Sequence, residues 1–220
     1  MTRIVVLRPE PGATATVDRA RKLGLDAVPI PLFEVEPVSW TAPEPGGFDG
    51  LLLTSANAVR QGGEGLKNLR GLKAYVVGEA TAEAAREVGF DIASTGDSGV
   101  ERLLGSIEPE LKLLHLCGAD RREPDDAKQQ ITPIIVYRAK PLAPDLSAVK
   151  ESVALIHSPR AGRRFAELVR ERNTISIAAM SDAAAEAVGG GWRGIEIADQ
   201  PTDDALLALA ARLCDKPDPK

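Results

Sequence analysis

Cysteine is scarce in this sequence. Two cysteines occur among 220 residues, Cys117 and Cys214, which is too few for a disulfide framework or a four-cysteine zinc site. A chain that depends on no disulfide fits a reducing compartment. We therefore expect a cytoplasmic protein.

Long apolar runs and an excess of basic residues are also absent. The apolar run at 4–7 is cut off by Arg8 and Pro9, and no stretch approaches the roughly 18 consecutive apolar residues of a membrane span. We therefore expect neither a membrane anchor nor export. The net charge of -5, from 27 basic and 32 acidic residues, argues against nucleic-acid binding through a basic face. Any bound anion must then be met by a local cluster of positive groups.

Three motifs of cofactor binding or catalysis are missing as well. The chain has no GxGxxG after a strand, no GxxxxGK[ST] and no GxSxG, so nucleotide binding and serine hydrolysis have little support. His115 and Cys117 lie two apart on one expected strand, and His157 closes another. A metal site or a Cys/His pair would need further converging groups, so we interpret these residues as structural and expect no metal and no cofactor.

Short β-branched runs alternate with amphipathic stretches along most of the chain. This alternation is typical of an α/β fold, in which helices cover a parallel sheet. Hydrophobic residues at 44% and charged residues at 27% are close to the globular average. Strands are expected at 4–7, 27–30, 51–53, 74–77, 91–93, 113–116, 134–137, 153–156, 175–179 and 195–198.

Two segments, 29–45 and 133–144, interrupt the alternation with prolines and read as linkers. Only two strands and one helix precede the first linker, and so short a piece cannot bury enough surface to fold alone. It must be completed by the other end of the chain. We therefore expect a discontinuous α/β domain at 1–33 plus 142–220, an inserted α/β domain at 42–132, and a two-stranded β connector at 34–41 and 133–141.

An internal repeat supports two similar parallel-sheet lobes. The segment LLLTSANA at 51–58 has a counterpart, ALIHSPRA, at 154–161. After an intervening helix in each half, YVVGEATA at 75–82 is echoed by IAAMSDAA at 177–184. A duplicated βα scaffold explains the pattern.

Small polar residues gather at the expected strand ends of both halves, just before helices. Ligands of open α/β sheets bind outside the carboxyl ends of the strands, where helix N-termini present free N–H groups to anions. Arginines beside them could grip carboxylates in bidentate fashion. Taken singly, each small polar residue is more often a helix N-cap. The candidates are Arg8, Thr54, Ser55, Asn57, Gly78, Thr81, Gly118, Arg121, Arg122, Ser158, Arg160 and Ser181.

Tyr137 ends the expected strand of the second linker, beside the cleft that two lobes would form. Its hydroxyl could donate a proton or a hydrogen bond to a departing oxygen. A packing role explains the same position equally well: Tyr137 would then be a half-buried aromatic residue of the strand whose hydroxyl bonds a backbone group.

A series of short fragments in a fixed order runs nearly end to end along the chain. These are Val6-Leu7-Arg8-Pro9, Phe48-Asp49-Gly50, 54–59, 76–82 followed by Gly89, Leu116-Cys117-Gly118 with Arg122, Val136-Tyr137-Arg138 and His157-Ser158-Pro159. Together they resemble the uroporphyrinogen-III synthase family. Members of that family are lyases of haem biosynthesis that cyclise hydroxymethylbilane to uroporphyrinogen III, with inversion of ring D and loss of water.

The resemblance implies two α/β lobes on a two-stranded connector, and a cytoplasmic monomer that needs no cofactor. The implied substrate, hydroxymethylbilane, is a linear tetrapyrrole with eight carboxylates, and a transient contact with the enzyme that forms it is compatible with this. By similarity, Tyr137 assists departure of the hydroxyl and Thr81 supports it. The residues assigned to substrate binding are Arg8, Thr54, Ser55, Asn57, Gly78, Gly118, Arg122, Ser158 and Ser181.

Two differences from the family are expected to matter, and two rival interpretations stay open. The segment between Arg122 and Tyr137 is shorter than in the family, and Pro124, Asp125 and Asp126 indicate a reduced first helical turn. The chain has Met-Ser-Asp-Ala at 180–183, where the family often has Gly-Pro-Thr-Thr, so fewer hydroxyl contacts are expected there. A non-catalytic two-lobe module that binds an anionic tetrapyrrole-like ligand is one rival, and the presence of both Thr81 and Tyr137 counts against it. A nucleotide-dependent α/β enzyme is the other, and it lacks the glycine motifs.

Overall fold

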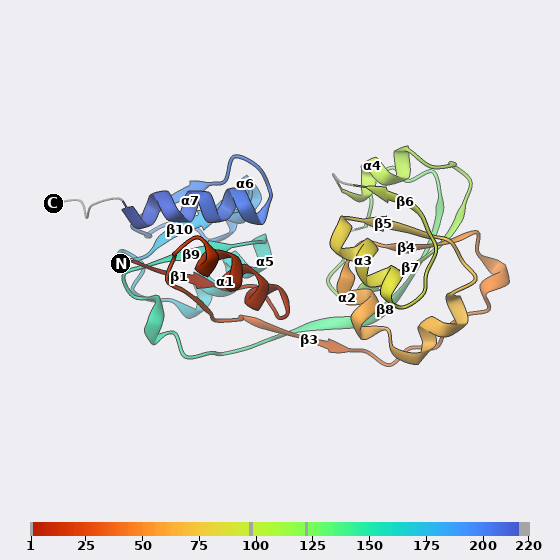
Figure 1. The fold of residues 1–220 in the computed structure, drawn as a ribbon, viewed down its shortest axis with the longest axis horizontal. Helices are drawn as coiled ribbons and strands as arrows, with labels where there is room; N and C mark the ends of the chain where they lie inside the picture. Colours follow the sequence, from red (N-terminus) through yellow and green to blue (C-terminus); the bar gives the residue numbers. More distant parts are fainter. Residues whose placement is uncertain (1, 97–98, 122, 216–220) are drawn as a thin grey trace. The chain divides into compact units, whose positions relative to one another are not determined.

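The computed structural model describes residues 2–96, 99–121 and 123–215, and the chain forms two compact units (Figure 1). Unit 1 combines Met1–Glu34 with Pro141–Lys220, and unit 2 is Val35–Lys140. Each unit contains one predominantly parallel sheet with helices, so the α/β class predicted from the sequence is confirmed. Among the described residues, no helix is long and apolar enough to cross a membrane.

The sheet of unit 1 has five strands in the order β11-β10-β9-β1-β2, and every pair is parallel. β9 is fully buried and β1 is buried after its exposed first residue, Arg3, as expected for a parallel sheet covered on both faces. Ile4, Val5 and Val6, for example, have no exposed surface. The strands are β1 (Arg3–Val6), β2 (Ala27–Pro29), β9 (Ser152–Ile156), β10 (Ser176–Ala179) and β11 (Gly194–Ile197).

Four α-helices and a short 3-10 helix accompany this sheet. α1 and α7 share one apolar cluster with β1, β9 and β10, while α5 and α6 pack against each other. Leu206, Leu209, Ala210 and Leu213 supply the buried stripe of α7, as their helical spacing predicts. The helices are α1 (Gly12–Lys22), η3 (Ser147–Val149), α5 (Pro159–Leu168), α6 (Asp182–Ala187) and α7 (Asp203–Asp215).

The sheet of unit 2 has six strands in the order β3-β8-β7-β4-β5-β6. The β4–β5, β4–β7, β5–β6 and β7–β8 pairs are parallel. Around the remaining pair, the Val38 N–H donates to the Val136 carbonyl and the Leu142 N–H to the Leu32 carbonyl, so these two segments run antiparallel. The strands are β3 (Phe33–Pro37), β4 (Gly50–Leu53), β5 (Ala74–Val77), β6 (Ile92–Gly96), β7 (Lys112–Gly118) and β8 (Gln130–Pro141).

Helices also pack on both faces of this second sheet. One apolar cluster joins α2, η2 and α3 to alternate residues of β4, β5 and β7, including Leu51 and Leu53. A second cluster joins α4 to Leu52 and Leu113, which point the other way. The helices are η1 (Pro45–Gly47), α2 (Ala56–Gln61), η2 (Gly63–Leu69), α3 (Glu79–Glu87) and α4 (Val100–Gly105). Because the strands are parallel, the polar residues after β4, β5 and β7 share one edge of the sheet.

Candidate active site

A hollow of about 290 Å³ lies in unit 2 at the carboxyl ends of the parallel strands. Its walls come from the ends of β4, β5 and β7, from α4 and from the loop after β7. His115 and Tyr137 join them from within β7 and β8, so the expectation that Tyr137 ends its strand is wrong. Polar groups therefore converge there, as the position of the strand ends predicts. The lining residues are Thr54, Ser55, Val77, Val100, His115, Gly118, Asp120, Arg121, Pro124 and Tyr137.

Tyr137 is held over Gly118 in this hollow. The two residues are neighbours in the β7–β8 register, and the Ala119 N–H donates to the Tyr137 carbonyl at 2.9 Å. A Cβ on Gly118 would lie 2.7 Å from Cζ and 3.0 Å from the hydroxyl oxygen of Tyr137, so the ring position requires glycine. Burial raises the pKa of Tyr137, and a hydrogen bond from Ser55 opposes this. The phenol is therefore protonated at neutral pH and can donate.

Thr54 and His115 form a polar pair in the same hollow. The Thr54 hydroxyl lies 3.0 Å from His115 Nε2, and His115 is 2% exposed. Burial, and after it the charge of Arg121, lowers the pKa of His115 from 6.5 to about 4. The imidazole is therefore neutral at neutral pH. The sequence pointed to a structural role, and the structure adds that this side chain lines the hollow that contains Tyr137.

Cys117, two residues along β7, is a buried thiol. Its Sγ donates to the Ile134 carbonyl at 3.4 Å, and burial raises its pKa. A protonated thiol is a poor nucleophile and a poor metal ligand. Among the described residues, no cluster of three or more His, Cys, Asp or Glu side chains could hold a metal ion.

The other predicted residues of unit 2 lie around α2 and α3. Ser55 is the N-cap of α2, and its hydroxyl accepts from the Asn57 N–H at 3.2 Å. Gly78 precedes α3 with φ +82, a conformation that favours glycine, and its N–H already donates to the Gly96 carbonyl. Thr81 is buried in the first turn of α3 and is not part of the lining around Tyr137. Arg122 lies outside the described residues.

Ser158 and Ser181, the predicted residues of unit 1 that follow strands β9 and β10, are helix N-caps. The Ser158 hydroxyl accepts from the Ala161 N–H at 3.2 Å, and the Ser181 hydroxyl from the Ala184 N–H at 3.3 Å. These contacts match the general preference of serine for this position. Each side-chain oxygen thus already has a donor from its own helix.

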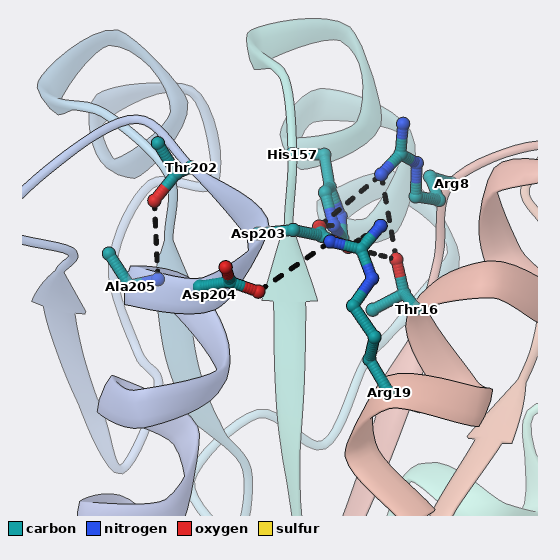
Figure 2. A network of polar contacts seen from close by, with 8 residues as sticks. All are labelled: Arg8, Thr16, Arg19, His157, Thr202, Asp203, Asp204 and Ala205. Atoms are coloured by element: carbon teal, nitrogen blue, oxygen red, sulfur yellow. Dashed lines mark hydrogen bonds and ion pairs between the residues drawn. The ribbon is translucent and has the colours of Figure 1, made fainter. Parts of the chain in front are cut away.

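Arg8, at the end of β1, belongs to a network centred on Asp203, the first residue of α7 (Figure 2). Asp203 Oδ1 accepts from His157 Nε2 at 2.9 Å and from Arg8 Nη1 at 3.3 Å. Its Oδ2 accepts from the Thr16 hydroxyl at 2.7 Å and forms an ion pair with Arg19 Nη2 at 3.2 Å.

Sequence reasoning missed Asp203. Burial alone would raise the pKa of Asp203, but the hydrogen bonds from His157 and Thr16 and the charges of His157 and Arg8 bring it to about 2. The carboxylate is therefore ionised throughout the physiological range. The one available signal was an acidic residue in the first turn of an expected helix, which usually only complements the helix dipole.

Comparison with known proteins identifies similar sequences and structures. A family model described as uroporphyrinogen-III synthase HemD matches residues 14–208. A uroporphyrinogen-III synthetase from Helicobacter pylori has 20% identity and a TM-score of 0.69, with 97% of this chain and 100% of that chain covered. A mutant uroporphyrinogen III synthase from the extremely thermophilic bacterium Thermus thermophilus has 18% identity and a TM-score of 0.55, with 98% and 100% covered. No curated protein matches the chain.

Proposed function

The chain belongs to the uroporphyrinogen-III synthase family, and we propose that the residues around Tyr137 carry out the water-loss step of that family's reaction. The enzyme is a lyase of haem biosynthesis that cyclises hydroxymethylbilane to uroporphyrinogen III, with inversion of ring D and loss of water. The match over residues 14–208 is the observation that carries this function. The roles of individual residues are our proposal.

Departure of the terminal hydroxyl is the step assigned to Tyr137. The hydroxyl leaves as water once it has gained a proton, and the adjoining pyrrole becomes an electrophilic azafulvene. Because burial raises the pKa of Tyr137, its phenol is a weak acid and acts mainly by hydrogen bonding to the leaving oxygen. The support for this role is the position of Tyr137 over Gly118, in a hollow that it shares with the Thr54–His115 pair.

Control of geometry is the second task of the site. The substituted carbon of the last pyrrole attacks the azafulvene to give a spiro intermediate, which fragments and closes again with ring D reversed. The bilane can also close unaided to the uninverted isomer, so the protein must favour one arrangement and keep water from the cation. We propose that Arg8, together with backbone N–H groups at the Ser55, Ser158 and Ser181 turns, holds the carboxylates. We propose that Thr81, which is buried in the first turn of α3, supports the site indirectly, without lining the hollow.

Isomer analysis tests the function directly. Incubation with enzymatically generated hydroxymethylbilane, followed by chromatographic separation, is expected to give uroporphyrinogen III. Formation of the uninverted isomer alone would contradict the function and favour a non-catalytic binding module. We also propose that the protein is a monomer and lies in the cytoplasm. Light scattering tests the first of these proposals, and cell fractionation tests the second.

The role of Tyr137 has a matched control, because the chain contains only one other tyrosine, Tyr75. Tyr137→Phe is expected to lower kcat by about 100-fold, as for loss of a donor used in the transition state, while product binding changes little. Tyr75→Phe, which lies outside the hollow, should leave kcat unchanged. An unchanged kcat in Tyr137→Phe would assign that residue to packing.

A further inference from the structure

An acidic residue at a helix N-terminus commonly caps the helix or complements its dipole, but Asp203 contacts side chains of other elements. The Thr202 hydroxyl already caps α7 by accepting from the Ala205 N–H at 3.3 Å (Figure 2). The carboxylate of Asp203 instead faces other elements, with hydrogen bonds to Arg8, Thr16 and His157. It therefore joins the carboxyl ends of β1 and β9 to α1 and α7.

Three hydrogen bonds and an ion pair surround this carboxylate. Oδ1 accepts from Arg8 and His157, and Oδ2 accepts from Thr16 and lies 3.2 Å from Arg19 Nη2. The Asp203 side chain is 9% exposed. Asp203 is thus buried among its own partners, and we expect it to affect a ligand through the groups that it holds.

Arg8 is the partner that can reach a ligand. Its side chain is 36% exposed, and the described contacts with Asp203 and Thr16 both use Nη1. Nε and Nη2 lie beside Gly12, where a Cβ would be 2.6 Å from Nε, so the start of α1 confines the guanidinium as well. Because guanidinium carries five N–H donors, this arrangement leaves a defined set of donors at the carboxyl end of β1.

Arg19 and His157 complete the support of the carboxylate. Arg19 is shared between Asp203 and the 88% exposed Asp204, at 3.6 Å from the latter. His157 Nε2 must carry a proton because a carboxylate only accepts, and its Nδ1 is buried with no hydrogen-bond partner among the described residues. His157 therefore holds Asp203 in place from the β9 side.

We infer that Asp203 is a positioning residue for substrate binding, which fixes the Arg8 guanidinium so that its remaining donors meet a carboxylate of the bilane. The inference rests on the proposed function, since it takes Arg8 as a substrate contact. A long arginine side chain that is already ordered loses less conformational entropy on binding. Loss of Asp203 should therefore weaken binding and leave the chemical step unaffected.

Asp203→Asn and Asp204→Asn form a matched pair, because both remove one charge from the same helical turn. Asp203→Asn is expected to raise KM for hydroxymethylbilane about 3- to 10-fold with kcat nearly constant, and Asp204→Asn to change neither. Binding of uroporphyrin III, an octacarboxylate measured by its own fluorescence, should weaken by a similar factor. An equal KM in the two variants would overturn the inference.

A double-mutant cycle with Arg8→Ala separates positioning from general structural support. If Asp203 acts through Arg8, Asp203→Asn should have no further effect on KM or on uroporphyrin III binding in the Arg8→Ala background. An undiminished effect there would overturn the inference. Should Asp203→Asn fail to fold, Thr16→Val removes the 2.7 Å contact to Oδ2 from a residue with no exposed surface, and should still raise KM about twofold.

Failure of the inference and failure of the function give different results. If the wild-type enzyme makes uroporphyrinogen III but Asp203→Asn behaves like Asp204→Asn, only the positioning role is lost. If the wild-type protein makes the uninverted isomer alone, the function is lost, and uroporphyrin III binding by the same variants still tests Asp203. Wild-type protein that does not bind uroporphyrin III would overturn the inference.

Discussion

Acidification from about pH 8 to about pH 5 is expected to destabilise unit 2 through His115. The pKa of His115 is about 4 in the folded protein and 6.5 when unperturbed, because burial disfavours its charged form. The unfolded chain therefore binds a proton that the folded chain does not. The stability that this difference confers is fully present above pH 6.5, the pKa of the unperturbed imidazole. It is lost as the pH falls toward the folded-state pKa of about 4. The expected loss is ~2 kcal/mol at about pH 5 and ~3 kcal/mol in full.

Tryptophan fluorescence can follow unit 2 separately. The chain has two tryptophans, Trp40 in unit 2 and Trp192 in unit 1. Trp40 packs against the main core cluster of unit 2, and its Nε1 donates to the Gly62 carbonyl at 2.9 Å. In a Trp192→Phe background, urea unfolding monitored at Trp40 reports the free energy of unfolding of unit 2.

The test compares the Trp192→Phe protein with the same protein carrying His115→Gln. Glutamine keeps a polar atom near the position of Nε2, which contacts Thr54, but does not titrate. We expect its unfolding free energy to change by less than ~0.5 kcal/mol over the same pH interval. An equal loss of unfolding free energy in the proteins with and without His115→Gln would refute the role of His115. Asp203 does not interfere, because its lowered pKa of about 2 confers stability that is lost only as the pH falls below its unperturbed value of 3.8.

Three further changes test particular contacts. Gly118→Ala should displace Tyr137, lower kcat at least about tenfold and destabilise unit 2 by ~1–3 kcal/mol. Gly46→Ala is the control: a Cβ there meets open space, so kcat and the free energy of unfolding should both stay unchanged. Ser158→Ala should cost unit 1 about 1 kcal/mol of unfolding free energy, measured at Trp192, because it removes the cap of α5; no change would mean that the cap is dispensable. Cys117→Ser should keep most activity, since burial raises the thiol pKa, and complete loss in a folded variant would point to thiol chemistry.

Local patterns predicted most of the regular elements. The runs at 4–7 and 51–53 are buried strands because they are continuously apolar, and the spacing of Leu206 and Leu213 gives α7 its buried face. The bounds of the strands near the prolines were less predictable. β8 runs from Gln130 to Pro141, longer than the strand expected at 134–137, and β3 covers Phe33–Pro37, where a connector strand was expected at 34–41. Pro133 is accommodated inside β8, opposite His115 in the register.

The site was only partly predictable, because its decisive contacts are long-range. Position in the chain placed Thr54 and Ser55 at the end of a strand, and the structure brings them into one hollow with Tyr137, which lies inside β8 and not at its end. A serine before a helix looks the same whether it caps the helix or binds a ligand. The contacts of Asp203 could not be anticipated, since His157 lies 46 residues away and Arg8 lies 195 away. Such pairings depend on which strand end meets which helix, and no local pattern records that.

The central place of β1 in the sheet of unit 1 has a consequence for synthesis on the ribosome. β1 lies between β2 and β9, but β9 begins at Ser152, after the whole of Val35–Lys140 has been translated. Until then the apolar segment of β1 lacks its partner β9 and stays exposed in the nascent chain, the kind of surface that promotes aggregation and chaperone binding. Unit 2, whose segments are contiguous, can mature first. Translation delayed near Pro141 would therefore prolong the interval in which β1 is unprotected.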